Sequence, residues 1–388
     1  MMMNRRSFLR NAGEGLLLVS SLSLMSSCSG VKRDDLLRRK DEKESIQGLE
    51  KDEIEILYLA SLAPSAHNTQ PWTLKVVEPK HWVIGSDKKR WLPAVDPENR
   101  EMLLSIGTFI ENLVIAAGTY GYSLDLQIIG KNRAETEIAE IRLKKSKTED
   151  FPLEKMKQRR TVRNHFLNEE IKTDDIKYIT KHDTRPCLAL TESPDLPFPH
   201  SFYFPKNSSQ GKYLQEGTVE ANRTQAFRDA AQEELSNWIR WSNKEAKKYR
   251  NGLTPESMDI TGVAGLYVRN FFNRQSVLKK SFREQTVDRI AKQVKNCGGW
   301  LVITSHDSSI PTLIEYGRRW EGMLLKIREK KIAIHPMTQM LEESPWKNQV
   351  AKELGLTGEV QWILRIGYLK SYPDPVSLRM PVTSFIQP

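Results

Sequence analysis

One polar stretch, LAPSAHNTQPW (Leu62–Trp72), interrupts a chain that is otherwise crowded with lysine, arginine and glutamate. The residues before it, IEILYLASL (Ile54–Leu62), have the apolar spacing of a helix, and the residues after it, WTLKVVEP, are typical of a strand. Pro64 disfavours helical geometry in the residue that precedes it, so the helix is expected to end there. The sequence therefore predicts a polar turn between a helix and a strand.

The length and composition of the chain limit the classes of protein to which it can belong. At 388 residues it can form two units or one large duplicated unit. Lysine and arginine outnumber aspartate and glutamate by ten, but the charges are interleaved rather than gathered in one block, so nucleic-acid binding is not expected. The three cysteines and seven histidines lack the spacing of a zinc site or of a disulfide framework.

The N-terminus has the features of an export signal. NRRSFLR (Asn4–Arg10) matches the twin-arginine pattern, and the apolar stretch Gly15–Met25 is too short to span a bilayer permanently. SLMSSC follows and resembles a lipobox, in which Cys28 would carry the lipid. Residues 1–28 are therefore predicted to direct a periplasmic or cell-surface lipoprotein to the membrane. An ordinary cleaved signal with an incidental cysteine is the alternative.

An internal repeat predicts two related α+β halves, residues 52–150 and 151–388. In each half a strand-like run precedes a long amphipathic helix, which carries a glycine, a glutamate four residues later and then an apolar triplet. The matching positions are Gly107, Glu111 and 113–115 in the first helix and Gly317, Glu321 and 323–325 in the second. A chance match between two amphipathic helices is the alternative to a true repeat.

Two segments lie outside this repeat. Residues 29–51 are highly charged and lack aromatic residues, so they are predicted to form a tether. Residues 217–280 have no counterpart in the first half and are predicted to be a helical insertion. Its aromatic residues include Trp238, Trp241, Phe271 and Phe272.

Four segments resemble motifs of the nitroreductase-like flavoproteins, in the order that the family shows. PSAHNTQPW resembles the signature Pro-Ser-x-x-Asn-x-Gln-Pro-Trp, and RRTVR (159–163) resembles the phosphate motif Arg-x-Ser/Thr-x-Arg/Lys. IAIHPMTQ (332–339) corresponds to the loop that faces the flavin, and SLRMP (377–381) to the basic C-terminal segment. With the twin-arginine leader and the length of the chain, the resemblance is to exported, single-chain, tandem nitroreductase-like proteins, and it implies their fold.

The resemblance implies an FMN site. The predicted cofactor-binding residues are Pro64, Ser65, Asn68, Arg159, Arg160, Thr161, Arg163, Met337, Thr338 and Arg379. Guanidinium groups would bind the phosphate by charge-assisted hydrogen bonds, and at a helix start Arg159 and Arg163 would face one anion. Gln70 and Trp72 are expected to hold the turn against the core. His67 is expected to be packed or at the surface rather than catalytic.

The resemblance also implies a pseudo-dimer within one chain, and hence a monomer with one complete site. The Pro-Ser-x-x-Asn motif occurs only in the first half, and the Arg-x-Thr-x-Arg motif only in the second. The flavin would carry the chemistry, so no catalytic side chain is predicted. The sequence predicts an FMN-dependent oxidoreductase that takes electrons from an unidentified membrane donor. A non-catalytic, flavin-sequestering lipoprotein and a cofactor-free lipoprotein are the alternatives.

Overall fold

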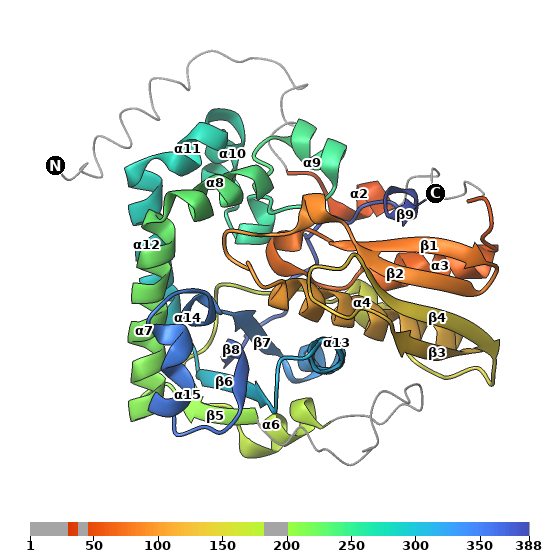
Figure 1. Ribbon diagram of the computed structural model, residues 1–388. Coiled ribbons are helices and arrows are strands. Elements are labelled where there is room, and N and C mark those ends of the chain that lie inside the picture. Colours follow the sequence, from red (N-terminus) through yellow and green to blue (C-terminus); the bar gives the residue numbers. More distant parts are fainter. Residues whose placement is uncertain (1–29, 38–45, 182–200, 388) are drawn as a thin grey trace.

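The computed structural model describes residues 30–37, 46–181 and 201–387, and the predicted export signal with Cys28 lies outside them. The described residues form helices and two separate β-sheets, so the predicted α+β class is confirmed. Figure 1 shows the first sheet on the right and the second at the lower left, with two long helices, α4 (Arg100–Thr119) and α13 (Ile310–Ile327), near the centre.

The first sheet has the strand order β3-β4-β2-β1-β9. Its strands are β1 (Trp72–Glu78), β2 (His81–Ser86), β3 (Tyr122–Ile128), β4 (Glu137–Lys145) and β9 (Ile386–Gln387). The first four pair antiparallel with their neighbours, whereas β9 lies parallel to β1. The C-terminus of the chain therefore completes the sheet that the N-terminal part begins.

The second sheet repeats this arrangement. Its strands are β5 (Ser201–Pro205), β6 (Gly299–Ser305), β7 (Ile332–Pro336) and β8 (Glu359–Tyr368). Their order is β5-β6-β8-β7, and all neighbours are antiparallel. This is the order β1-β2-β4-β3 of the first sheet, and in both sheets the long helix follows the second strand.

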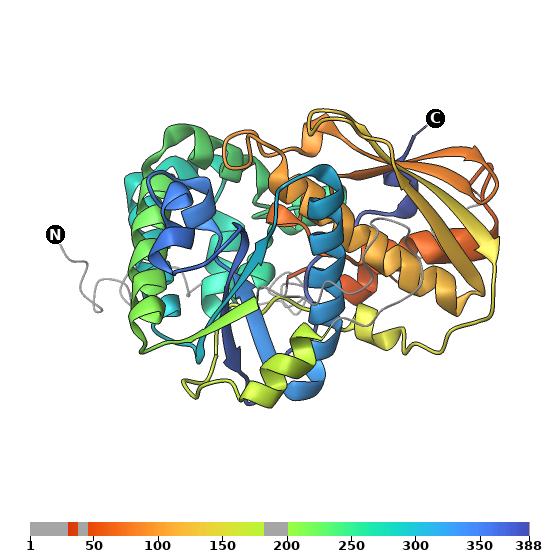
Figure 2. The same cartoon turned by 60° about the horizontal axis from the view of Figure 1, so that its bottom comes forward.

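The matched glycines lie where α4 and α13 cross. A Cβ atom on Gly107 would lie 2.2 Å from the carbonyl oxygen of Ile314, and one on Gly317 would lie 2.1 Å from that of Leu104. Ile314 lies three positions before Gly317, and Leu104 lies three positions before Gly107, so the two helices make the same contact in both directions. Because glycine has no Cβ, the two backbones can approach this closely. Figure 2 shows α13 upright between the first sheet and the rest of the molecule.

One hydrophobic core extends from the first sheet across α4 and α13 to the second sheet. Trp72 is fully buried in it and stacks on Phe109, with the ring centroids 5.0 Å apart. Helix α4 is apolar and long enough to span a membrane, but 94% of that stretch is buried within the protein. It is therefore a core helix, which agrees with the amphipathic pattern of its sequence.

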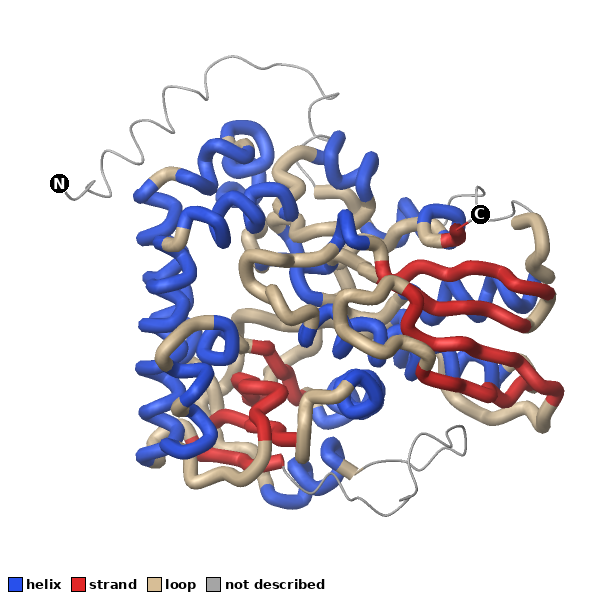
Figure 3. The backbone as a smooth tube through the Cα atoms, viewed as in Figure 1, coloured by secondary structure: helices blue, strands red, loops and turns tan. Residues whose placement is uncertain are grey.

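Six helices lie between β5 and β6, where the first sheet has only the two-residue turn 79–80 between β1 and β2. They are α7 (Ser209–Phe227), α8 (Asp229–Trp238), α9 (Asn243–Tyr249), α10 (Gly262–Phe271), α11 (Arg274–Leu278) and α12 (Lys280–Val294). They extend beyond the predicted limits of residues 217 and 280. Figure 3 shows them, in blue, along the left and upper sides of the molecule.

The remaining helices are short, apart from the one before the polar turn. They are α2 (Arg33–Leu37), α3 (Lys51–Ser61), α5 (Glu154–Lys157), α6 (Thr173–Thr180), α14 (Gln339–Glu342) and α15 (Val350–Glu353). Helix α2 lies within the segment predicted to be a tether, and Leu36 is buried against Ala246 and Leu378. The tether prediction is therefore wrong for α2, because an apolar side chain there packs on the folded body.

Candidate active site

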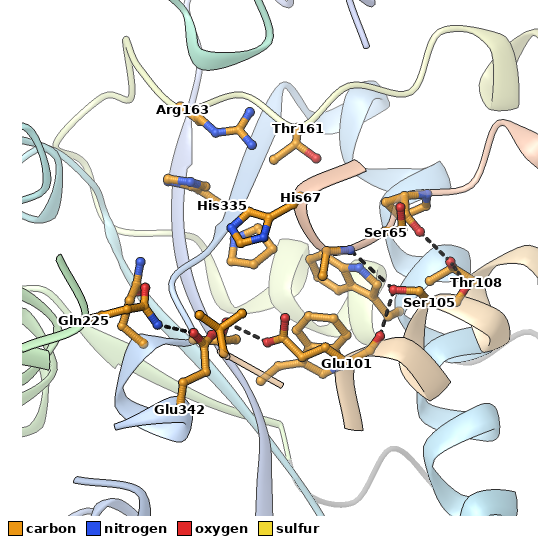
Figure 4. Close-up of a pocket in the computed structure, with 18 residues that line it drawn as sticks. Ser65, His67, Glu101, Ser105, Thr108, Thr161, Arg163, Gln225, His335 and Glu342 are labelled. Atoms are coloured by element: carbon orange, nitrogen blue, oxygen red, sulfur yellow. Dashed lines mark hydrogen bonds between the residues drawn. The ribbon is translucent and has the colours of Figure 1, made fainter. Parts of the chain in front are cut away.

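A polar cavity of about 210 Å³ lies between the turn at residues 64–67, the segment 161–163 and the end of β7 (Figure 4). Five of the predicted cofactor-binding residues line it: Pro64, Ser65, Thr161, Arg163 and Thr338. The first two come from the N-terminal part of the chain and the other three from the C-terminal part. The volume is below the roughly 300 to 1,000 Å³ that ligand pockets typically have.

The polar turn is held by its own amides. The backbone N–H of Gln70 donates to the Ser65 hydroxyl at 2.9 Å, and the Gln70 side chain donates to the Arg250 carbonyl and accepts from the Met380 N–H. Gln70 and Trp72 are both fully buried, so the expectation that they hold the turn against the core is confirmed. His67, which was expected to be packed or at the surface, lines the cavity, where burial lowers its pKa.

Asn68 and Met337 do not line the cavity. The Asn68 side chain is buried, donates to the carbonyls of Gly252 and Leu378, and accepts a hydrogen bond from Arg379 at 2.9 Å. Met337 is fully buried in a hydrophobic cluster, because the segment predicted to be a loop begins as strand β7 and directs this side chain into the core. The structure therefore does not bring these two predicted residues to the cavity, and both side chains hold the fold.

Arg159 and Arg163 do not face one anion. Helix α5 ends at Lys157, so the two arginines lie in non-helical chain and their side chains separate. Arg163 lines the cavity and donates to the carbonyl of Ser257. Arg160 points elsewhere, to Asp259 at 2.5 Å.

Arg159 instead meets Arg379, from the far end of the chain, behind the polar turn. Both guanidinium groups are buried and donate to the same carbonyl, that of Leu62, at 3.1 and 2.9 Å. Arg379 also donates to the carbonyl of Ala63. Glu321 is the nearby carboxyl group, 3.5 Å from Arg159 Nε, and burial raises its pKa to about 7 despite that arginine.

The opposite end of the cavity is acidic, which the sequence analysis missed. The Thr338 hydroxyl oxygen lies 2.9 Å from Glu101 Oε1 and 2.8 Å from Glu342 Oε1. A hydroxyl group has one proton and can donate to only one of them, so the other carboxyl must itself donate. Arg100 pairs with Glu101 at 3.2 Å, whereas burial and Glu101 raise the pKa of Glu342 to about 8. Glu342 is therefore the protonated partner at neutral pH.

His335 is neutral at the end of the cavity where Arg163 lies (Figure 4). Burial, Arg365 and Arg163 lower its pKa well below the ordinary value. Its Nδ1 atom lies 3.3 Å from an Arg365 nitrogen and can accept that N–H. The cavity thus has a cationic wall opposite its acidic wall.

The four aromatic residues named above for the predicted insertion do not line the cavity. Among the described residues of the six helices between β5 and β6, Gln225 of α7 lines it, and its amide donates to Glu342. Trp238 packs in a cluster with Leu92 and Val95 of the N-terminal part. Trp241 and Phe272 pack together within the helical region, and Phe271 is 68% exposed.

Comparisons with known proteins agree with the motif resemblance over part of the chain. No family model matches. The chain is 39% identical over 67 residues to "Putative NAD(P)H nitroreductase Rv3131" of Mycobacterium tuberculosis, covering 17% of this chain and 19% of that protein. It is 38% identical over 73 residues to "Probable NAD(P)H nitroreductase PigM" of a Serratia strain, covering 19% and 20%. The chain therefore matches about a fifth of each curated relative.

A solved structure described as a "putative nitroreductase" from Anabaena variabilis covers 88% of this chain and 92% of its own, with 10% identity and a TM-score of 0.33. A score this low carries no argument about the site. The sequence matches support a resemblance to the nitroreductase-like family over about a fifth of each relative.

Proposed function

We propose that this chain is a nitroreductase-like flavoprotein that binds one FMN between its two halves. The observation that carries the proposal is the meeting of two distant motifs. The turn of the Pro-Ser-x-x-Asn motif and the Arg-x-Thr-x-Arg segment line one cavity, and Arg159 and Arg379 meet on the carbonyl of Leu62 directly before that turn. A phosphate-bearing cofactor matches this chemistry.

The charges of the site fit the phosphate of FMN. The Nε atoms of Arg159 and Arg379 are buried and have no hydrogen-bond partner within the part of the chain that the structure describes. Arg159 pairs with Glu321 at 3.5 Å, and the Nη atoms of Arg379 already have oxygen acceptors. An anion would add an acceptor for the two Nε atoms and a second negative charge beside Glu321. The cavity itself is small for a ligand site, so admitting a flavin ring requires the lining side chains to move apart.

We propose that the two halves are tandem copies that form a pseudo-dimer, with α7 to α12 as a helical insertion. The identical strand order of the two sheets and the reciprocal glycine contact support the duplication. The position of the six helices between β5 and β6 supports the insertion. Since each half carries only one of the two motifs, this arrangement has one complete site, and the chain would act as a monomer.

A bound flavin supplies the electron transfer, and the protein positions it and sets its surroundings. The neutral Glu342 carboxyl and the Glu101 carboxylate would hold a proton at the acidic wall. A flavin-sequestering protein without turnover is the second candidate, and the small volume of the cavity favours it. Turnover of the holoprotein with a chemical reductant and an electron acceptor separates the two candidates.

We also propose export by the twin-arginine route and a lipid anchor on Cys28. The supporting observations are the sequence patterns alone, because these residues lie outside the described structure. Mass spectrometry of the mature N-terminal peptide should find an acylated Cys28. An unacylated N-terminus at another residue would rule out the lipoprotein.

The flavin content of the purified chain tests the main proposal. After denaturation, flavin and phosphorus should each be close to one per chain, whereas a value near zero or near two contradicts a single FMN site. Arg159→Ala should weaken FMN binding by about 2 kcal/mol, roughly 30-fold, through loss of a charged contact to the phosphate. Arg223→Ala, an exposed position on α7, is the matched control and should leave the affinity unchanged.

A further inference from the structure

A third buried arginine, Arg33, lies on the short helix α2 near the N-terminus. Leu36 of this helix packs against Leu378, the residue before Arg379, so α2 lies next to the segment that carries Arg379. Arg33 is only 5% exposed. Its pKa is lowered to about 10 by burial and then by the charge of Arg159, and the charge of Arg33 in turn lowers the pKa of Arg379. The three guanidinium groups therefore lie close enough to repel one another, although they come from three separate parts of the chain.

Helix α2 is held in this place by specific contacts. Leu36 packs against Ala246 and Leu378, and its carbonyl oxygen accepts a hydrogen bond from Arg250 at 3.4 Å. Gly30 lies directly against Glu256, since a Cβ atom on it would be 2.0 Å from that carboxylate. Arg33 is therefore positioned by packing on both sides of it and is not a freely moving surface side chain.

The cluster has more positive charge than the neighbouring carboxyl group can neutralise. Glu321 is the acidic group that acts on Arg159 and Arg379, and its pKa of about 7 leaves it partly protonated at neutral pH. The Nε atoms of all three arginines, and both oxygens of Glu321, are buried without a hydrogen-bond partner in the described residues. Arg159 pairs with Glu321 at 3.5 Å, but this one carboxyl cannot neutralise three buried guanidinium groups, so the cluster favours an added anion.

We propose that Arg33 is the third arm of an anion site that binds a phosphate monoester, and that α2 closes over it. The identity of this ligand as the phosphate of FMN rests on the function proposed above. A phosphate monoester carries about −1.5 to −2 charges at pH 7. It suits three guanidinium groups whose acidic neighbours are the buried Glu321 and, beside Arg33, the exposed Asp34. Because the anion contacts α2, phosphate binding and the docking of residues 30–37 must stabilise each other.

Binding of FMN and of riboflavin to full-length variants tests this inference, because the two ligands differ only in the phosphate. Arg33→Ala should weaken FMN binding by about 10- to 100-fold and leave riboflavin binding unchanged. Lys32→Ala is the matched control, because it removes one positive charge from the exposed position next to Arg33. It should leave the affinities for FMN and for riboflavin unchanged. Equal FMN affinity of Arg33→Ala and the wild type would overturn the inference.

Hydrogen exchange of residues 30–37 supplies a readout that needs no variant. In the wild type, FMN should slow exchange in this segment more than riboflavin does, and equal exchange with both ligands would overturn the inference. If the wild type binds no FMN, the proposed function fails, and inorganic phosphate becomes the probe. Slower exchange with phosphate would then still support the anion site, and unchanged exchange would reject it.

Discussion

Glu342 shows how a carboxyl group on a half-exposed cavity wall can remain neutral at physiological pH. Its oxygens face the Thr338 hydroxyl and the Gln225 amide, and a protonated carboxyl satisfies both partners. Ionisation would place its charge next to Glu101, which already accepts from Arg100 and from Thr338. The proton on Glu342 therefore lets two acidic groups share one wall.

Glu342→Gln should change the pH dependence of stability. With a pKa of about 8 in the folded protein and 4.5 as the ordinary value, native Glu342 keeps a proton that the unfolded chain loses between these values. The free energy of unfolding of the wild type therefore falls as pH rises from about 4.5 to 8, and glutamine removes this contribution. The Tm of the variant relative to the wild type should rise across this window and then level off.

Thermal unfolding from pH 4.5 to 9 measures this difference. Glu353→Gln on α15 is the control, because it replaces an exposed carboxyl group that does not line the cavity. A Tm difference between Glu342→Gln and the wild type that stays constant from pH 4.5 to 9 would contradict this prediction. It would show that Glu342 ionises normally and that the Thr338 hydroxyl donates its proton to Glu342.

At the residue scale the sequence identified the segments of the site better than the roles of individual side chains. The motifs located Pro64, Ser65, Thr161 and Arg163 at one cavity. They could not show that Asn68 bonds to a group 311 positions away in the chain, because pairing of buried polar groups depends on the tertiary fold. Nor could they select the cavity carboxyl groups from a chain with 49 acidic residues.

The crossing of α4 and α13 is the element-scale feature that joins the two sheets. The reciprocal contact at Gly107 and Gly317 places each helix against a backbone carbonyl of the other. At the same crossing region, Arg318 of α13 pairs with Glu111 of α4 at 3.0 Å. The glycine and glutamate positions of the sequence repeat therefore mark the contact between the elements.

Gly317→Ala should destabilise the protein by about 3 kcal/mol, because its Cβ atom would lie 2.1 Å from the Leu104 carbonyl and the helices would have to separate. Gly322→Ala on the same helix is the matched control. A Cβ atom there meets nothing within 4 Å, so the better helix propensity of alanine should stabilise by up to about 1 kcal/mol. Chemical denaturation measures both, and equal effects would contradict the close crossing.

The sequence predicted most elements near the two motifs, because hydrophobic periodicity is a local signal. It did not predict β9, a two-residue strand that pairs with β1, more than 300 positions earlier. It also missed α2, where five residues within a charged segment are held by contacts to Ala246 and Leu378. Elements that depend on distant partners carry no periodic pattern of their own.

At the scale of the whole molecule, two sheets with the same topology surround a site that is not symmetric. The cavity takes its turn and Glu101 from the N-terminal part and its cationic segment and Glu342 from the C-terminal part. Each part alone would leave charged groups without their partners, so the site exists only when both are folded together. The two motifs show in the sequence that both parts of the chain contribute to one site. Glu101 and Glu342 belong to no motif and meet only in the folded protein, so the sequence could not predict the acidic wall.

The last prediction concerns the electron donor and follows from the proposed compartment together with the small cavity. An exported protein would meet no pool of reduced nicotinamide, and a cavity of about 210 Å³ leaves little room for a second ring beside a flavin. The holoprotein should therefore show little flavin reduction by NADH or NADPH, although the curated proteins it partly matches are named NAD(P)H nitroreductases.

Stopped-flow mixing of the holoprotein with excess NADPH measures this directly, with absorbance of the oxidised flavin as the signal. Dithionite is the control, because it should bleach the same flavin and so show that the cofactor can be reduced. Bleaching by NADPH faster than about 1 per second, the low end of typical enzyme turnover, would refute the prediction. Such a rate would mean that the lining side chains move apart readily, and that nicotinamide, rather than a membrane donor, supplies the electrons.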